Sequence, residues 1–366
     1  ATGINGNQLD DSAPEAGAVY VFMRNGTSWT QQAYIKASNT NAGDWFGTSI
    51  ALSGTGSMLV VGAFNEDSGT TGIDGNQEDD RAQDAGAVYI FARSGSVWAQ
   101  QSYIKSSNAE AGDQFGFHVA LSTDASTLAV CAFGEDSAAI GVNGNRFDNS
   151  APQAGAVYLF THAGSTWSQD AYIKASNTEA GDKFGSKAAL SSDGKTLAVG
   201  AENEKSSATG INGNQQDNSS DDVGAVYIYT HEGTNWLQQA YIKASNTNTD
   251  EFGMAVALTS DGNTLAVGAR AENSAAKDIN GNQLDTSADL AGAVYMFTRS
   301  GVTWRQQAYI KATNTDADDW FGDGVALSND GSTLVVGAGG EDGGIIGING
   351  YPADNSAPNA GAVYVY

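Results

Sequence analysis

Hydrophobic and polar positions along the chain repeat the same order of short segments. In residues 184–194, "FGSKAALSSDG", small and apolar residues alternate into a polar turn, and "KTLAVGA" follows at hairpin distance. A polar loop then leads to "GAVYIYTHEG" at 224–233 and "NWLQQAYIKAS" at 235–245. Runs of this length, rich in β-branched and aromatic residues, predict four β-strands per unit. No segment keeps a 3.6-residue apolar period, so we expect no helix of consequence.

The motif Gly-Ala-Val-Tyr recurs at a nearly constant interval. Its successive starts lie 69, 69, 69, 68 and 69 residues apart, at Gly17, Gly86, Gly155, Gly224, Gly292 and Gly361. A fixed period of this size, built from short strands, indicates stacked repeats rather than one aperiodic core. A lone four-stranded sheet is marginally stable, so each must pack on its neighbours. The pattern predicts an all-β fold, a β-propeller of four-stranded antiparallel blades with about 69 residues per repeat and at least five blades.

Aromatic residues at the repeat period are the predicted core. The motif tyrosines and the phenylalanines of the Phe-Gly pairs should fill layers between blades, and five tryptophans should lie at the core rim. The tyrosines are Tyr20, Tyr89, Tyr158, Tyr227, Tyr295 and Tyr364; the phenylalanines are Phe46, Phe115, Phe184, Phe252 and Phe321; the tryptophans are Trp29, Trp98, Trp167, Trp236 and Trp304. The glycine after each phenylalanine should allow backbones to approach closely.

We expect a single domain over residues 1–366. Its blades would span 46–105, 115–174, 184–243 and 252–311, with a closing blade from 321–366 plus 17–38. This arrangement leaves one third strand in excess, either 17–22 or 361–366. We favour an excerpt from a longer secreted array; the alternatives are a displaced strand, or an open edge that completes a sheet of another copy.

Charge narrows the possible partners. Lys and Arg number 17 against 42 Asp and Glu, for a formal net charge of −25. This balance argues against nucleic acid and anionic membrane surfaces, because the phosphate-neutralising interaction would be repulsive. It favours divalent cations, cationic partners or simply a soluble surface. The single cysteine, Cys131, excludes an internal disulfide, and the apolar runs are far shorter than the roughly 18 residues of a membrane span.

The polar loop between the second and third strands carries a repeated oxygen-rich motif, Asn-Gly-Asn-x-x-Asp. Its members are Asn5, Asn7 and Asp10; Asp74, Asn76 and Asp79; Asn143, Asn145 and Asp148; Asn212, Asn214 and Asp217; Asn280, Asn282 and Asp285; and, with Tyr351 in the middle, Asn349 and Asp354. A glutamate begins each loop, sometimes followed by aspartate, at Glu66, Asp67, Glu135, Asp136, Glu204, Glu272, Glu341 and Asp342.

Two interpretations of this loop stay open. Oxygen ligands on alternate residues, a glycine at the turn and a following carboxylate suit Ca²⁺, which binds six to eight oxygens. The same residues also build Asx-turns, in which side chains satisfy backbone amides without a metal. The acidic charge of the repeated loops favours a bound cation.

The connection from the fourth strand to the next blade should lie on the same face as these loops. Its aspartates, Asp44, Asp113, Asp182, Asp250 and Asp319, should cap the connection or pair with the lysines of "YIKAS", which are Lys36, Lys105, Lys174, Lys243 and Lys311. Trp45 and Trp320 precede the phenylalanine in two copies and are candidate contacts for a sugar or a protein partner.

Catalysis needs residues that converge once, and the repeats offer none that stand out. No nucleophile elbow, phosphate-binding loop or His-rich metal motif occurs, and the chain has only three histidines. We therefore expect no catalytic residues and no enzyme, with a polysaccharide lyase or hydrolase as the alternative.

The pattern "FGxxVALSxDGxTLAVGA" followed by "GAVYVF" resembles the FG-GAP repeat, the blade unit of the integrin α-subunit propeller and of many secreted bacterial proteins. The resemblance covers essentially the whole chain, through five Phe-Gly starts and six Gly-Ala-Val-Tyr strands. It implies a propeller, commonly seven-bladed, with binding or adhesion roles outside the cell or at its surface. The family often holds calcium between the first two strands of a blade, but the turns here at 191–195 and 121–127 are too short and too poor in carboxylates.

Three functions follow as hypotheses. The first is a non-enzymatic extracellular module for binding, adhesion or structure, with a protein or glycan ligand on the long-loop face and with Ca²⁺ as a stabilising ion if the loops bind it. The second is a carbohydrate-binding or polysaccharide-active propeller. The third is a subunit of an extracellular assembly joined by strand complementation.

Overall fold

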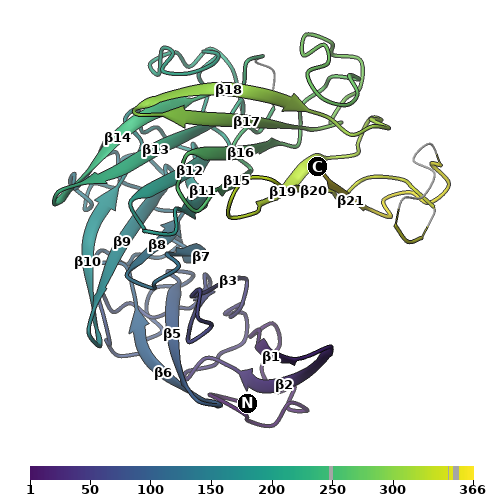
Figure 1. The fold of residues 1–366 in the computed structure, drawn as a ribbon. Helices are drawn as coiled ribbons and strands as arrows, with labels where there is room; N and C mark the ends of the chain where they lie inside the picture. The colour runs from purple at the N-terminus through teal and green to yellow at the C-terminus, as the bar shows by residue number, and fades with distance from the viewer. Residues whose placement is uncertain (247–249, 345, 349–353) are drawn as a thin grey trace. The chain divides into compact units, whose positions relative to one another are not determined.

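A computed structural model describes residues 1–246, 250–344, 346–348 and 354–366, and strands are its only long regular elements (Figure 1). Four sheets have four antiparallel strands each. They are β3 (Ser49–Leu52), β4 (Met58–Ala63), β5 (Ala87–Ser94) and β6 (Val97–Ile104); β7 (Phe115–Leu121), β8 (Thr127–Ala132), β9 (Ala156–Ala163) and β10 (Thr166–Ile173); β11 (Phe184–Leu190), β12 (Thr196–Ala201), β13 (Ala225–Glu232) and β14 (Asn235–Ile242); and β15 (Ala255–Leu258), β16 (Thr264–Ala269), β17 (Ala293–Ser300) and β18 (Thr303–Ile310).

Two smaller sheets accompany these four. The strands β19 (Phe321–Leu327), β20 (Leu334–Ala338) and β21 (Ala362–Val365) form a three-stranded sheet. The strands β1 (Val19–Asn25) and β2 (Ser28–Ile35) form a hairpin. The predicted order of four strands per repeat is confirmed, and so is the expectation that helices are absent, within the residues that the structure describes.

The chain divides into two compact units, residues 1–174 and 175–366, which are considered separately. The predicted closing blade draws on residues of both units. The predicted closing blade from 321–366 plus 17–38 therefore stays a prediction. No helix in the described ranges is long and apolar enough to cross a membrane.

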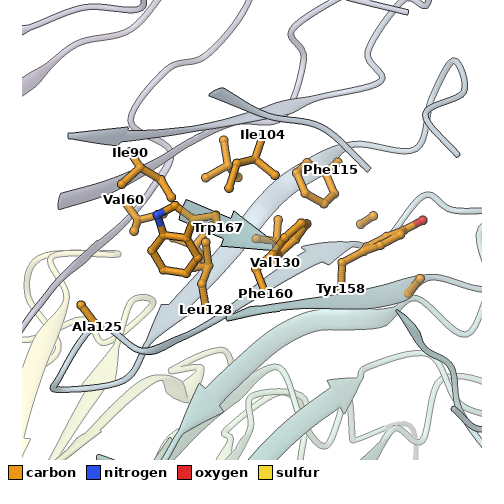
Figure 2. Packing of buried hydrophobic residues seen from close by; sticks show 14 of the residues in the cluster. Val60, Ile90, Ile104, Phe115, Ala125, Leu128, Val130, Tyr158, Phe160 and Trp167 are labelled. Carbon is orange, nitrogen blue, oxygen red and sulfur yellow. The ribbon is translucent and has the colours of Figure 1, made fainter. Parts of the chain in front are cut away.

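In the first unit, the sheet β3–β6 packs face to face on the sheet β7–β10 (Figure 2). One face supplies Val60 and Ile90, and the facing sheet supplies Phe115, Val130 and Phe160, all of them buried. The Phe115 ring meets the Phe160 ring edge to face at a centroid distance of 6.2 Å. These contacts confirm the Phe-Gly phenylalanines as core residues.

Glycine makes this packing possible at one point. A Cβ on Gly62 of β4 would lie 2.0 Å from the carbonyl oxygen of Gly116 in β7. Gly116 itself has φ +91°, a conformation that side chains rarely adopt. The two backbones are therefore in direct contact, as the glycine of the Phe-Gly pair predicted.

The second unit repeats this packing. Val226 and Ile228 of β13 lie against Phe252, Tyr295 and Phe297, the last two from β17. A further cluster joins the β15–β18 sheet to β19–β21, through Val294 and Met296 on one side and Phe321 and Val336 on the other. These interiors are built from apolar residues, most prominently aromatic and β-branched ones, that recur at the repeat period.

The hairpin β1–β2 departs from the predicted core. Tyr20 is 48% exposed and Trp29 is 65% exposed, whereas the equivalent Tyr89 and Trp98 are 0% and 5% exposed. The prediction that every motif tyrosine and rim tryptophan is buried is wrong for these two. In complete sheets the tyrosine packs on the phenylalanine of the Phe-Gly pair, as Tyr89 packs on Phe46, and the two-stranded sheet includes no such pair.

Candidate functional site

Five of the long loops are fastened along the outer strand of their own sheet. In the first complete sheet, the Asp74 N–H donates to the Tyr103 carbonyl at 2.7 Å, and the Lys105 N–H donates to the Gly72 carbonyl at 2.8 Å. Between them Ile73 forms an antiparallel bridge with Ile104 of β6, and Ile4, Val142, Ile211 and Ile279 make the equivalent bridge elsewhere. The loop therefore covers part of an edge strand that would otherwise expose unpaired backbone groups.

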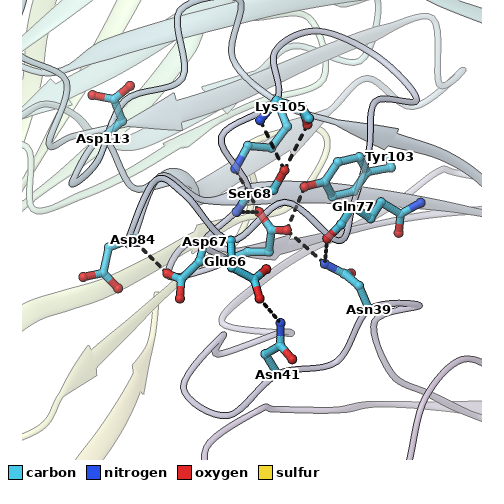
Figure 3. A network of polar contacts seen from close by, with 12 residues as sticks. Asn39, Asn41, Glu66, Asp67, Ser68, Gln77, Asp84, Tyr103, Lys105 and Asp113 are labelled. Atoms are coloured by element: carbon cyan, nitrogen blue, oxygen red, sulfur yellow. Dashed lines mark hydrogen bonds and ion pairs between the residues drawn. The ribbon is translucent and has the colours of Figure 1, made fainter.

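A buried carboxylate lies at the entrance of this loop (Figure 3). Oε1 of Glu66 accepts hydrogen bonds from Asn39 Nδ2 at 2.9 Å and from the Tyr103 hydroxyl at 2.8 Å. Oε2 accepts from Lys105 Nζ at 2.8 Å and from the Ser68 N–H at 3.0 Å. The Glu66 and Lys105 side chains are 1% and 0% exposed, so this is a fully buried ion pair whose carboxylate has four protein donors.

Asn39 links this pair to the preceding connection and to the third strand. It lies before β3, and its Oδ1 accepts a hydrogen bond from the Tyr89 hydroxyl of β5 at 2.5 Å. Its Nδ2 also donates to the Gln77 carbonyl in the long loop at 2.8 Å. One amide side chain thus ties the connection, the third strand and the loop to the ion pair.

The ion pair recurs in every complete sheet. Nζ–Oε2 distances are 2.7 to 2.8 Å in the pairs Lys174–Glu135, Lys243–Glu204 and Lys311–Glu272. Burial lowers the pKa of Lys105, and the Glu66 carboxylate opposes that shift by favouring the charged ammonium. The pair is therefore an electrostatic clamp inside the protein, repeated at the base of the long loop in each of the four complete sheets.

This geometry corrects the prediction that the lysines of "YIKAS" pair with the aspartates of the connection. Their carboxylate partners are the glutamates assigned to calcium, not the aspartates of the connection. The loop folds back along the outer strand and so brings Glu66 to Lys105, 39 positions further along the chain. The other predicted role of the aspartates, capping, is confirmed: Asp44 accepts from the Asn41 N–H at 2.8 Å, and Asp113, Asp182 and Asp319 make the same contact.

The Asn-Gly-Asn-x-x-Asp motif forms turns. Asn7 and Asp10 each accept a hydrogen bond from the backbone N–H two residues later, at 3.0 and 3.1 Å. Asn5, with φ 57°, accepts from the Tyr34 N–H at 3.0 Å. In the other copies, the residues that accept from the backbone N–H of a fourth-strand tyrosine are Asp74, Asn143, Asn212 and Asn280. The residues that accept from the backbone N–H two positions later are Asn76, Asn145, Asp148, Asn214, Asp217, Asn282, Asp285 and Asp354.

The remaining loop carboxylates also have protein partners. Asp79 pairs with Arg81 at 2.5 Å. Asp67, Asp136 and Asp342 each accept from a backbone N–H 17 residues further along, at 2.7 to 2.8 Å. Asn349 lies outside the described residues. The structure thus places the proposed ligands in three groups: buried ion pairs, turns, and supports for the end of the loop.

This donor set does not fit a calcium ion as it is arranged. Both Glu66 oxygens are engaged by protein donors, and the turn oxygens accept backbone N–H groups. In the part of the chain that the structure describes, no group of three or more His, Cys, Asp or Glu is placed to hold a metal. Calcium binding by these loops stays a prediction from sequence.

An aromatic cluster lies where the first connection meets the first strands. Trp45 is 46% exposed, and its ring packs edge to face on Phe64 at 5.7 Å. Phe64 contacts Phe117 at 5.5 Å, and Phe117 contacts Phe133 at 4.1 Å, with all three phenylalanines only partly buried. Trp45 is therefore an exposed aromatic surface supported by a row of rings, which we call the aromatic cluster.

A groove of about 440 Å³ runs beside the aromatic cluster. Its lining is formed by Glu15, Gly17, Ala18, Trp45, Phe46, Gly47 and Thr48. Trp45 is fixed there in a left-handed conformation, φ 56°, and its N–H donates to the Glu15 carbonyl at 3.1 Å. The groove thus combines the exposed ring of Trp45 with the carboxylate of Glu15, on a backbone held by hydrogen bonds.

Sequence reasoning found Trp45 but missed its three phenylalanines. The signal was available, because Phe64 and Phe133 break the repeat: the equivalent positions of the second unit hold Glu202 and Arg270. There, charges pair instead, with Arg270 2.5 Å from Glu251 and Lys183 3.3 Å from Glu202. Trp320, the other predicted contact, is 38% exposed in the second unit.

We expect Lys105→Met to destabilise the protein by about 3–5 kcal/mol, because it leaves the Glu66 carboxylate buried without its counterion. The double variant Glu66→Gln/Lys105→Met should recover much of this loss, since no buried charge remains. Urea unfolding measures both. Arg81→Met, which removes an exposed ion pair in the same loop, is the control and should lower the free energy of unfolding by less than about 1 kcal/mol. If Lys105→Met lowered it by no more than Arg81→Met does, the buried Lys105–Glu66 pair would not stabilise the protein as we infer.

Asp113 should make stability depend on pH. Burial raises the pKa of this carboxyl to about 8, above its value in the unfolded chain, so the folded state binds its proton more tightly. The protonated Asp113 carboxyl therefore contributes to the stability of the folded protein at low pH, and this contribution is lost as the pH rises toward 8.

The variant Asp113→Asn keeps an oxygen for the Glu110 N–H and cannot ionise. We expect it to match the wild type near pH 4 and to exceed it increasingly up to pH 8, by up to about 1.4 kcal/mol per pH unit. Thermal unfolding across pH measures the difference, with the exposed Asp221→Asn as control. A difference that does not vary with pH would exclude this role for Asp113.

Comparison with known proteins identifies the repeat. The FG-GAP repeat family matches residues 29–91, 98–160, 167–229 and 304–366. Each matched range has 63 residues, which gives 252 of the 366 residues. No curated protein matches the chain.

Solved structures give weaker likenesses. A chain of Kuenenia stuttgartiensis hydrazine synthase aligns with a TM-score of 0.46 and 12% identity, over 88% of this chain and 78% of that one. A putative 6-phosphogluconolactonase from Bacteroides uniformis aligns with a TM-score of 0.40 and 13% identity, over 95% and 98%. Neither supports a functional argument.

The family match and the repeated sheets lead to the same conclusion. The matched ranges cover well over half of the chain, and each contains strands of the antiparallel sheets described above. This protein belongs to the FG-GAP repeat family and has its all-β propeller fold of four-stranded antiparallel blades.

Proposed function

We propose that this protein is a non-enzymatic binding module that acts outside the cell, with the aromatic cluster at Trp45 as its contact surface. The observation that carries the proposal is the exposed Trp45 ring, backed by Phe64, Phe117 and Phe133 beside a groove of about 440 Å³. Large aromatic residues exposed on a rigid surface are typical of binding hot spots.

The ligand follows from the chemistry of this groove. Trp45 offers a flat apolar face, and Glu15 offers a hydrogen-bond acceptor. This pair suits a sugar ring, which stacks on tryptophan and donates hydroxyl hydrogen bonds. The net charge of −25 disfavours anionic polysaccharides, so we propose a neutral glycan first and a neutral or basic protein surface second.

The absence of catalysis is also part of the proposal. The groove lining includes one carboxylate, Glu15. Glycoside hydrolysis normally uses two carboxyl groups on opposite sides of the scissile bond. This chemistry favours binding over cleavage, and a polysaccharide lyase or hydrolase remains the alternative that an assay of polysaccharide breakdown would reveal.

The proposed location rests on the family and on the acidic surface. FG-GAP repeats resemble the blades of integrin α-subunits and of secreted bacterial proteins, and a charge of −25 suits a soluble extracellular protein. We propose an extracellular or cell-surface location. Cell fractionation with an antibody against this chain tests it, and recovery only from the cytoplasm would contradict it.

Trp45→Ala should weaken glycan binding at least tenfold, because it removes the stacking surface. Trp320→Ala is the matched control. Trp320 holds the same repeat position, but its carbonyl accepts the N–H of Asp323, which lies 3.7 Å from Arg270, so its surroundings are charged rather than aromatic. A neutral-glycan array followed by calorimetry with the best hit measures both variants. Equal losses in both would exclude the aromatic cluster as the determinant, and no binding across glycans and basic proteins would overturn the proposed function.

Calcium should have little effect on this module. Because the loop oxygens are engaged by protein donors, we expect about 5 mM CaCl₂, which exceeds the roughly 0.1–1 mM dissociation constants of weak extracellular sites, and excess EDTA to give the same melting temperature. A clear rise in melting temperature with calcium, reversed by EDTA, would instead support the sequence-based prediction of a metal in these loops.

A further inference from the structure

The chemically labile dipeptide Asn-Gly recurs along the chain in two different settings. In this dipeptide the backbone nitrogen of glycine can attack the side-chain amide of asparagine, because glycine has no Cβ to hinder the approach. Within the described residues, four such asparagines belong to the loop motif and one lies at the end of β1. All five are exposed, so exposure to water does not distinguish them. The motif members are Asn5, Asn143, Asn212 and Asn280, and the fifth is Asn25.

The motif asparagines are held at two points. The Asn143 N–H donates to the Tyr172 carbonyl at 2.7 Å, and Asn143 Oδ1 accepts from the Tyr172 N–H at 2.9 Å. The following Gly144 is crowded, since a Cβ there would lie 2.8 Å from the Ala139 Cβ. The Asn143 side chain can reach the Gly144 nitrogen only after its bond to Tyr172 opens. The same two-point contact holds Asn5, Asn212 and Asn280.

Asn25 has no such restraint. It ends β1 opposite Ser28, so Gly26 and Thr27 form a two-residue turn. Among the residues that the structure describes, none forms a hydrogen bond with the Asn25 side chain. The space around Gly26 is open, because a Cβ there would have no atom within 4 Å. Exposed turn tips open at little cost in free energy, so the Asn25 amide and the Gly26 nitrogen can meet.

The open position of this turn is general to the repeat. The equivalent turns at 95–96, 164–165, 233–234 and 301–302 are exposed as well, and their glycines also have open space around them. In those turns the residue before glycine is serine, alanine or glutamate. The β1–β2 turn therefore differs from them in carrying an asparagine at a position that every copy exposes.

We propose that Asn25 is a site of spontaneous deamidation and that the loop motif protects its own asparagines from this reaction. The Gly26 nitrogen loses its proton to base and forms a bond to Cγ of Asn25, and the side-chain nitrogen leaves as ammonia. The product is a cyclic succinimide. Water then adds to either ring carbonyl and opens the ring to aspartate or isoaspartate. Overall, one water is consumed and one ammonia is released.

One copy of the motif shows that the aspartate product is compatible with the clamped geometry. Asp74 holds the position of Asn143, its N–H donates to the Tyr103 carbonyl at 2.7 Å, and its Oδ1 accepts from the Tyr103 N–H at 2.9 Å. A motif asparagine that reacted to aspartate would therefore leave a folded protein in which the change could be detected. Slow reaction at the motif then measures the restraint on the side chain.

Reaction at Asn25 changes both the charge and the backbone of the turn. Either product adds a negative charge to an already acidic protein. Isoaspartate also adds one carbon to the backbone before Gly26, whose carbonyl accepts from Arg24 Nε at 2.9 Å. This inference concerns the chemistry of the turn and does not depend on the proposed binding surface.

Peptide mapping by mass spectrometry, after incubation of the whole folded chain at alkaline pH, tests the proposal. We expect Asn25 to convert at least tenfold faster than Asn143, Asn212 and Asn280, with isoaspartate among its products. The rate at Asn25 should rise with pH, because base removes the Gly26 proton. In concentrated urea, which releases the motif from the outer strand, all four asparagines should react at similar rates.

Two variants isolate the site. Asn25→Gln, whose longer side chain closes a ring less readily, should lack the acidic species that the ageing wild type accumulates on anion exchange. Asn143→Asp, which reproduces the Asp74 contact, is the matched control and should accumulate that species at the wild-type rate. The proposal would be overturned if Asn25 stayed unchanged in the folded chain, if the motif asparagines reacted as fast as Asn25 before unfolding, or if Asn25→Gln still aged like the wild type.

Discussion

The structure depends on a lysine–glutamate pair that is buried at the base of the long loop in each complete four-stranded sheet. Removing both charges from water is costly, and the cost is offset only when the geometry is close and the remaining lone pairs are satisfied. Glu66 meets both conditions, with Lys105 at 2.8 Å and three further donors. Because those donors come from the connection, the outer strand and the loop, the pair holds three segments in one arrangement.

The position of the candidate binding surface follows from the backbone hydrogen bonds at the ends of the long loops. The end of each long loop accepts backbone hydrogen bonds from the following connection, as in Trp45 with Glu15 and Phe115 with Ala85. Fixing the loop therefore fixes the connection and the residue before each Phe-Gly pair. In the first unit these residues are Trp45 and Gln114, and the hydrogen bond to Glu15 holds the exposed Trp45 on its left-handed backbone.

Function in a repeat protein is expected where the repeats differ. The buried pair, the Asx-turns and the glycine contacts recur in nearly identical geometry, and they account for stability. The positions occupied by Phe64 and Phe133 in the first unit hold Glu202 and Arg270 in the second. These positions are half-exposed and lie outside the repeated contacts, so they can vary without loss of the fold.

The sequence by itself determined the strands, the turns, the buried phenylalanines and the capping aspartates, because all of these follow from local periodicity and turn chemistry. The tertiary structure alone decided which charges meet. Glu66 and Lys105 are 39 residues apart, and nothing local to either shows that the loop folds back along the outer strand to join them. For the same reason the sequence did not show that an ammonium group lies beside the Glu66 carboxylate, and it assigned Tyr20 and Trp29 to the core although both are exposed on the β1–β2 hairpin.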